Sequence, residues 1–145
     1  MKKYFLVKVK YERLAEIGMI ESVSEQYLID AVSFTEAEAR INSEIRSTLP
    51  KGCDFEVKGI TPQKVDEIFF DENCEKWFKS KINFLFTDDK GKEKKTPIII
   101  FVQANDINHS REKLVEQMKD SMADWEIAII SDTKIIEVFK YEPEN

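Results

Sequence analysis

Two predicted strands place aromatic rings and lysines on one face, and this pattern points most directly to binding chemistry. Strict alternation along a strand puts every second side chain on the same side of a sheet. The candidate ligand-binding residues are Tyr4, Lys8, Lys10, Trp77, Lys79 and Lys81. Aromatic rings can stack on bases, and lysines can pair with phosphates. The pattern therefore indicates an anionic ligand or a nucleic acid.

The same residues have a simpler interpretation as an ordinary solvated sheet face. Lysines on exposed strands keep the edges of a sheet from pairing with other molecules. Under strict alternation Leu28, Ile99 and Phe101 would lie on that same side. Such a face is either partly covered or forms an interface. Both interpretations remain open at the level of the sequence.

The residue types that usually perform catalysis are sparse. His109 is the only histidine, and we predict it at the third position of a helix as a solvent-exposed residue with no ligand-spaced Cys or acidic cluster around it. Asp88 and Asp89 lie in a lysine-flanked hairpin tip, which predicts solvation, and Ser33 and Thr35 lie at a helix start. No P-loop, GxGxxG or GxSxG motif occurs. We therefore predict no catalytic residue, no metal and no cofactor, and an enzyme is the weakest functional class.

Composition predicts a compact globular chain with an acidic surplus. With 145 residues it is one ordinary domain, and 42% hydrophobic residues argue against disorder. The net charge of −6 argues against a strongly basic nucleic-acid binder but leaves room for a local basic face. Cys53 and Cys74 lack CxxC spacing and are predicted to be free thiols. No apolar run is long enough to span a membrane, and the alternating start differs from a signal peptide, so we predict a cytoplasmic protein without a membrane partner.

The chain is predicted to be one supersecondary unit written twice. An offset of 73 residues matches the first strands and helices, and an offset of 70 matches the segments after the helices. Matched pairs include Tyr4 with Trp77, Phe5 with Phe78, Lys8 with Lys81, Arg40 with Lys113, Phe55 with Trp125 and Phe69 with Phe139. One deletion in the loop after the second helix reconciles the offsets, and loops tolerate such changes. We predict a single domain, 1–145, built of repeats over 3–70 and 76–141.

Each repeat is predicted to contain a strand, a strand, a helix and a strand, with an extra strand as a tail. The predicted strands are Tyr4–Tyr11, Gln26–Val32, Phe55–Ile60, Val65–Phe70, Lys76–Phe86, Thr96–Ala104, Trp125–Ser131 and Lys134–Phe139. Ser33 followed by Glu36 has the capping-box spacing, and Asp106 caps a second helix predicted to run to about Met122. The apolar stripes predicted to face a sheet are Phe34, Ala37, Ile41, Ile45 and Leu49 in the first helix, and Ile107, Leu114 and Met118 in the second.

These elements predict an α+β fold with two helices on a mixed or antiparallel sheet, or on two related sheets, with approximate two-fold pseudosymmetry. Thr96–Ala104 is rich in Ile, Phe and Val, which predicts a central strand buried on both faces. Thr61-Pro62 is predicted to break the third strand. We expect the two repeats to share one core.

Several segments resemble a family of small proteins of unknown function from Bacteroidota and their phages or mobile elements. The resemblance covers almost the whole chain. Its residues are YLIDAVSFTEAEARI at 27–41, EIFF at 67–70, KWFKSKINF at 76–84, GKEKKT at 91–96, VQANDI at 102–107, SMADWEIA at 121–128 and EVFKY at 137–141. The resemblance implies a bacterial or phage cytoplasmic setting, and it implies no activity, cofactor or catalytic residue.

Three functional hypotheses follow. The first is a non-catalytic binding protein that recognises an anionic ligand or nucleic acid through the aromatic–lysine face or the seam between the repeats. A phage counter-defence protein that sequesters a nucleotide signal is a specific form of it. The second is a protein–protein interaction or structural accessory that self-associates as a homo-oligomer. The third is an enzyme, which needs a pocket of convergent polar groups that the sequence does not indicate.

Overall fold

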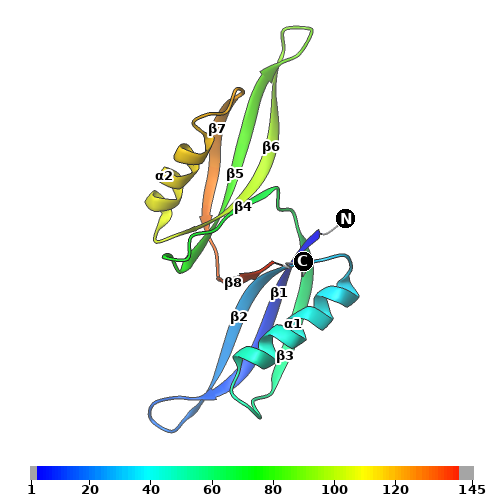
Figure 1. Cartoon of the computed structure of the whole chain (residues 1–145), viewed down its shortest axis with the longest axis vertical. Coiled ribbons are helices and arrows are strands. Elements are labelled where there is room, and N and C mark those ends of the chain that lie inside the picture. Colours follow the sequence, from blue (N-terminus) through cyan, green and yellow to red (C-terminus); the bar gives the residue numbers. More distant parts are fainter. Residues whose placement is uncertain (1–2, 141–145) are drawn as a thin grey trace, which may run out of the picture. The chain divides into compact units, whose positions relative to one another are not determined.

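The computed structural model describes residues 3–140, which divide into two compact units. Unit 1 consists of the described parts of Met1–Lys64 and Lys134–Asn145, and unit 2 is Val65–Thr133. Within the described residues there are two helices and two mixed sheets, which confirms the predicted α+β class (Figure 1). Neither of the helices in this part of the chain is long and apolar enough to cross a membrane.

Unit 1 is a four-stranded sheet with one helix along one face (Figure 1). The strand order is β3-β1-β2-β8, with β8 parallel to β2 and the other pairs antiparallel. Its elements are β1 (Lys3–Leu14), β2 (Ile20–Ala31), α1 (Phe34–Thr48), β3 (Phe55–Gln63) and β8 (Ile135–Phe139).

Alternation along β1 builds the core of unit 1. Phe5, Val7 and Val9 are buried against the inner stripe of α1, which includes Ala37 and Ile41. The predicted N-cap of α1 is confirmed, because the Ser33 hydroxyl oxygen accepts a hydrogen bond of 3.2 Å from the backbone N–H of Glu36. Phe34 departs from the predicted stripe: it is exposed in the first turn, although its ring lies 4.9 Å from that of Phe5.

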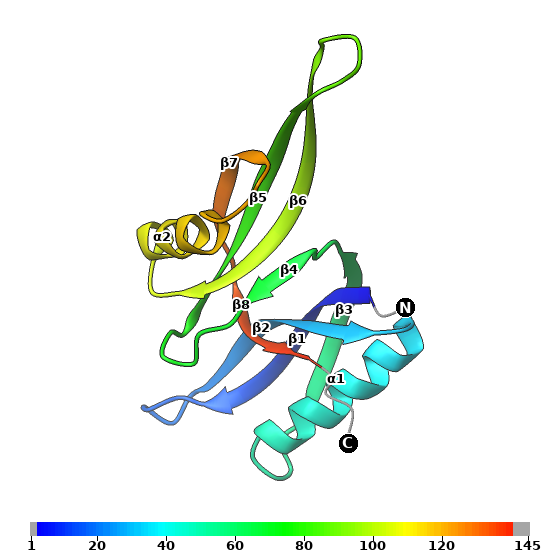
Figure 2. The same cartoon turned by 45° about the horizontal axis from the view of Figure 1, so that its top comes forward.

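Unit 2 has a sheet of the order β4-β6-β5-β7, in which β4 is parallel to β6 and the other pairs are antiparallel. Its elements are β4 (Glu67–Phe69), β5 (Lys76–Thr87), β6 (Glu93–Ala104), α2 (Ile107–Met118) and β7 (Asp124–Asp132). β6 lies between β4 and β5, which confirms the predicted central strand. Figure 2 shows the β5–β6 hairpin extending beyond β7.

Several predicted boundaries were wrong. Strand β1 continues to Leu14 and β2 begins at Ile20, whereas the predicted strands ended at Tyr11 and began at Gln26. Pro62 lies inside β3, because β3 is an edge strand and a missing N–H is tolerated there. Helix α2 ends at Met118, before the predicted end, and its first residue, Ile107, is exposed.

The two tail strands lie in unexpected sheets. β4 follows β3 after three residues (64, 65 and 66) but pairs with β6 in unit 2. β8 follows β7 after two residues (133 and 134) but pairs with β2 in unit 1. The compact units therefore differ from the predicted repeat ranges at these two strands.

Most of the buried apolar side chains form two clusters, where we expected one shared core; Leu28, Trp77 and Phe101 are buried but belong to neither cluster. The first cluster lies under α1 and includes Ile29 and Ile45, and the second lies under α2 and includes Val102 and Leu114. Each helix covers the apolar face of the sheet in its own unit, so each amphipathic surface is buried within one unit.

The β8 strand is predicted to stabilise unit 1. The Phe139 ring stacks on Tyr27 with centroids 5.4 Å apart and packs against the unit 1 core. We expect Phe139→Ala to lower the free energy of unfolding by about 2 kcal/mol, because it removes apolar contacts and leaves a cavity. Ile136→Ala, an exposed position in the same strand, is the control and should cost less than about 0.5 kcal/mol. Urea unfolding measures both, and equal effects would contradict the role of β8.

Candidate functional site

The predicted binding residues of unit 1 lie on the face of the sheet that points away from α1. We call Tyr4, Lys8 and Lys10 the basic face. Both lysines are exposed, and within residues 3–140 neither makes an ion pair. Tyr4 is half-buried, and its pKa is raised by burial and by the nearby Asp30 carboxylate, while Arg40 lowers it. These three residues are therefore on one face, as their spacing predicts.

The predicted binding residues of unit 2 are in a less accessible setting. Lys79 and Lys81 are half-buried. Trp77 is only 3% exposed, and the Phe70 ring meets it edge-on at 5.5 Å. The alternation of β5 places Trp77 outward, where its ring is buried and in contact with Phe70, directly after β4. Trp77 therefore presents no free ring for stacking in this structure.

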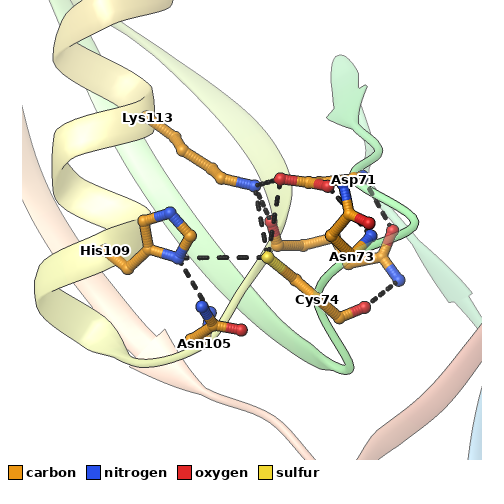
Figure 3. A network of polar contacts seen from close by, with 7 residues as sticks. Asp71, Asn73, Cys74, Asn105, His109 and Lys113 are labelled. Carbon is orange, nitrogen blue, oxygen red and sulfur yellow. Dashed lines mark hydrogen bonds and ion pairs between the residues drawn. The ribbon is translucent and has the colours of Figure 1, made fainter.

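A polar cluster in unit 2, which sequence reasoning missed, joins helix α2 to the connection between β4 and β5 (Figure 3). We call Asp71, Cys74, His109 and Lys113 the thiol cluster. The Cys74 Sγ lies 3.5 Å from Asp71 Oδ2, 3.6 Å from Lys113 Nζ and 4.0 Å from His109 Nδ1. His109 and Lys113 face this connection together because they are four residues apart, about one helical turn.

Hydrogen bonds fix the backbone around the thiol cluster. The Asp71 N–H donates to the Gln103 side-chain oxygen at 2.9 Å, and the Gln103 amide donates to the Cys74 carbonyl at 2.9 Å. The Lys113 ammonium donates to the Gln103 carbonyl at 2.8 Å and to the Asp71 carboxylate. The end of β6, the connection and α2 are thus tied together.

His109 is not the isolated, solvated residue that we predicted. It is half-buried, and its Nδ1 accepts a hydrogen bond of 3.1 Å from the backbone N–H of Asn105. This bond leaves Nδ1 unprotonated and places the proton of the neutral ring on Nε2. Its backbone N–H is held by Asp106, the N-cap of α2, at 2.7 Å. The approach of Cys74 links residues 35 positions apart, so no local spacing in the sequence signals it.

The electrostatics of the thiol cluster are dominated by one ion pair. The hydrogen bond from Lys113 lowers the pKa of the Asp71 carboxyl to about 2, and the backbone N–H of Asn73 adds to this shift. The ammonium and the carboxylate neutralise each other beside the sulfur, and Cys74 is 4% exposed. The arrangement is therefore a polar clamp around a buried thiol.

A hollow of about 460 Å³ lies beside the clamp. Its lining includes Phe69, Asp71, His109, Glu112 and Lys113. Among residues 3–140 no group of three or more His, Cys, Asp or Glu side chains is arranged to hold a metal ion. The hollow therefore offers polar contacts at one wall and an apolar ring at the other.

A family model described as a domain of unknown function (DUF4494) matches residues 3–141, almost the whole length of the sequence. No curated protein and no solved structure matches the chain. The match agrees with the resemblance to an uncharacterised domain family.

The clamp predicts how the stability of unit 2 depends on pH. The folded-state pKa of Asp71 lies below its unfolded value of about 4, so its stabilising contribution is present above that value and is lost as the pH falls towards about 2. We expect Lys113→Met to make the acid loss of stability shallower than in the wild type. Urea midpoints at several pH values, read by tryptophan fluorescence, measure this, since Trp77 and Trp125 both lie in unit 2.

The matched control is Lys119→Met in the same unit, which removes the same charge from an exposed pair with Glu116. It should leave the acid profile unchanged. An identical profile for Lys113→Met and the wild type would show that the pair is not coupled to folding.

Proposed function

We propose that this chain, which belongs to the DUF4494 family, is a non-catalytic binding protein whose basic face recognises an anionic ligand, with single-stranded nucleic acid as the favoured class. The observation that supports this most is the pair of exposed lysines on β1 with no ion pair inside the described residues, on the same face as the half-buried ring of Tyr4.

The geometry of a strand suits a ligand with repeated negative charges. A strand rises about 3.3 Å per residue, so the backbone positions of Lys8 and Lys10 are about 7 Å apart along β1. Gly59 of β3 lies opposite Lys8 in the register and has no side chain to shield it. The chain as a whole has a net charge of −6, so binding to a polyanion depends on this local field and should weaken steeply with salt.

The proposed setting is bacterial, phage or mobile-element, as the resemblance implies. Sequestration of a nucleotide signal in phage counter-defence is the narrower form of this proposal. The basic face supports it only through the affinity of lysines for phosphate, so free nucleotides belong in the same titration.

A second proposed function is self-association through the tip of the β1–β2 hairpin. Four apolar side chains in this tip are between 64% and 81% exposed; they are Leu14, Ile17, Met19 and Ile20. Clusters of exposed apolar residues of this kind often mark interaction sites. The pairing of β1 with β3 ends at Tyr11, and the tip of the hairpin extends beyond it. The edge of β1 in the tip therefore has no hydrogen bonds to β3.

We also propose that the two units descend from one copied segment. The two sheets have matching pairings. The strand after the helix pairs with the first hairpin strand, β3 with β1 in unit 1 and β7 with β5 in unit 2. A short strand pairs in parallel with the second hairpin strand, β8 with β2 in unit 1 and β4 with β6 in unit 2. A register shift falls at Lys8/Val9 in unit 1 and at Lys81/Ile82 in unit 2, which are 73 positions apart. An experimental structure in which Phe5 and Phe78 do not superimpose between the units would contradict this origin.

For anion binding, we expect the double substitution Lys8→Glu with Lys10→Glu to abolish binding of labelled single-stranded DNA, because it replaces two attractions with two repulsions. Fluorescence anisotropy at several salt concentrations, with RNA and free nucleotides as further probes, measures this. The control is Lys90→Glu with Lys92→Glu, which changes the same charge at an exposed hairpin of unit 2. Absence of salt-sensitive binding at high micromolar protein, or equal loss in both variants, would overturn the proposal.

For self-association, we expect the wild type to form oligomers at high concentration and Ile17→Lys to shift them to monomer, because the charge must be desolvated in an apolar contact. Sedimentation velocity or light scattering gives the mass directly. Met122→Lys, a substitution at an exposed apolar residue of unit 2, is the control. A strict monomer for the wild type would end this second proposal.

A further inference from the structure

A second hollow, in unit 1, lies on the α1 side of the sheet, across β1 from the basic face. It has a volume of about 620 Å³ and lies at the C-terminal end of α1. Its lining includes Tyr11, Glu25, Tyr27, Leu49 and Ile136. The hollow exists because β1 and β2 continue past the pairing with β3 and past the last turn of α1.

One carboxylate is held at the wall of this hollow by two phenols. The Tyr11 hydroxyl donates to Glu25 Oε1 at 2.7 Å, and the Tyr27 hydroxyl donates to Glu25 Oε2. Glu25 is half-buried, and Tyr27 is buried with its ring stacked on Phe139. The carboxylate is therefore held in orientation by two hydroxyls, one of them on Tyr27, which is packed into the core.

The protonation states of this triad leave the carboxylate as the acceptor. Burial and the Glu25 carboxylate raise the pKa of Tyr11 to about 12, and the same causes raise the pKa of Tyr27 further. Both phenols remain protonated donors at neutral pH. Each carboxylate oxygen has a second lone pair that these bonds do not use, and that lone pair is the acceptor available to a ligand.

The remaining walls suit a cation on an apolar stem. Leu49, Pro50 and the exposed side chain of Ile136 supply apolar surface. Thr48 and Leu49 bring the C-terminal end of α1, the negative end of its dipole, to the hollow. The Tyr11 ring can add a cation–π contact.

The charges around the hollow are consistent with a small cation. Three lining residues are acidic, namely Glu12, Glu25 and Glu137, and two are basic, namely Arg13 and Lys51. Arg13 is paired with Glu21 on the neighbouring strand, so its charge is partly offset by a carboxylate outside the lining. The alternation of β1 places the exposed Glu12 side chain on the other face, with Lys8 and Lys10, so the carboxylates on this side are Glu25 and Glu137. Glu25 is the one fixed by two hydrogen bonds.

We propose that this hollow binds a primary alkylammonium group on an apolar stem, with Glu25 as the anionic partner and the two tyrosines as the residues that orient it. The ammonium donates to the free lone pairs of the carboxylate, and the stem packs on Leu49 and Ile136. This site is separate from the basic face and takes a ligand of opposite charge.

Titration with phenethylammonium chloride, followed by the backbone amide NMR signals of Tyr11, Glu25 and Tyr27, tests this proposal. We expect saturable shifts at these amides and none with 2-phenylethanol, the matched neutral probe. Glu25→Gln keeps the shape of the side chain and should weaken binding about tenfold or more, because it removes the charged acceptor. Glu38→Gln on the exposed face of α1 is the control, and should leave the dissociation constant unchanged.

Arg13→Gln gives a second, independent readout. It removes the basic residue of β1 that lies on the same face as Tyr11, so it should tighten phenethylammonium binding a few-fold if charge attraction drives it. If only apolar contacts held the ligand, this substitution would leave the affinity for phenethylammonium unchanged. Equal shifts with 2-phenylethanol, or unchanged affinity in both Glu25→Gln and Arg13→Gln, would overturn the proposal.

The ammonium can belong to a free amine or to a lysine side chain of a peptide. A capped lysine, N-acetyl-lysine methylamide, is therefore titrated beside phenethylammonium. Tighter binding of the capped lysine supports a peptide source, and tighter binding of phenethylammonium supports a free amine. If neither probe binds, the proposal is overturned.

Discussion

The register of β1 is the constraint on which the rest of unit 1 depends. Its side chains alternate between the two faces of the sheet, and a slip of one residue would exchange the faces. Phe5, Val7 and Val9 fill the core under α1, so Lys8 and Lys10 must point to the other side. Burial of the apolar residues therefore determines where the lysines lie.

The same strand also creates the hollow at the end of α1. Tyr11 continues the inward series of β1 but is outside the core cluster under α1, and it lines the hollow at the C-terminal end of that helix. Its hydroxyl instead meets Glu25 on the neighbouring strand. A sheet that is longer than the helix covering it thus leaves a polar triad at an otherwise apolar face.

Local patterns predicted the elements well, because alternation, caps and turns are encoded within a few residues. Ser33 and Asp106 both cap helices where their spacing indicated. The partners of the tail strands could not be predicted, since a three-residue strand such as β4 carries no signal for which sheet it joins. The contact of Phe70 with the buried Trp77 ring follows from that pairing and was missed for the same reason.

The candidate sites were predicted only where one element supplies all the residues. The basic face lies on a single strand, and its spacing is visible in the sequence. The thiol cluster and the Tyr11–Glu25–Tyr27 triad join separate elements. His109 and Cys74 were noted in the sequence, but nothing in their spacing indicated that they meet. One available signal for the thiol cluster was the match of Arg40 with Lys113 in the predicted repeat. Each side chain donates to the backbone carbonyl of the second-last residue of the second hairpin strand, which is Asp30 in unit 1 and Gln103 in unit 2.

The basic face and the hollow at the end of α1 carry opposite charges, which explains how a chain with an acidic surplus can still present a basic surface. The sheet itself separates the exposed lysines on the outer face of β1 from the acidic residues around the hollow. The interior of the sheet has a lower dielectric constant than water. Salt screens exposed charges over about 8 Å at physiological ionic strength, so each surface acts on ligands through its own nearest charges. The net charge of −6 then describes the whole chain and neither surface. A ligand that reaches one face of unit 1 meets a field set by β1 and its immediate neighbours.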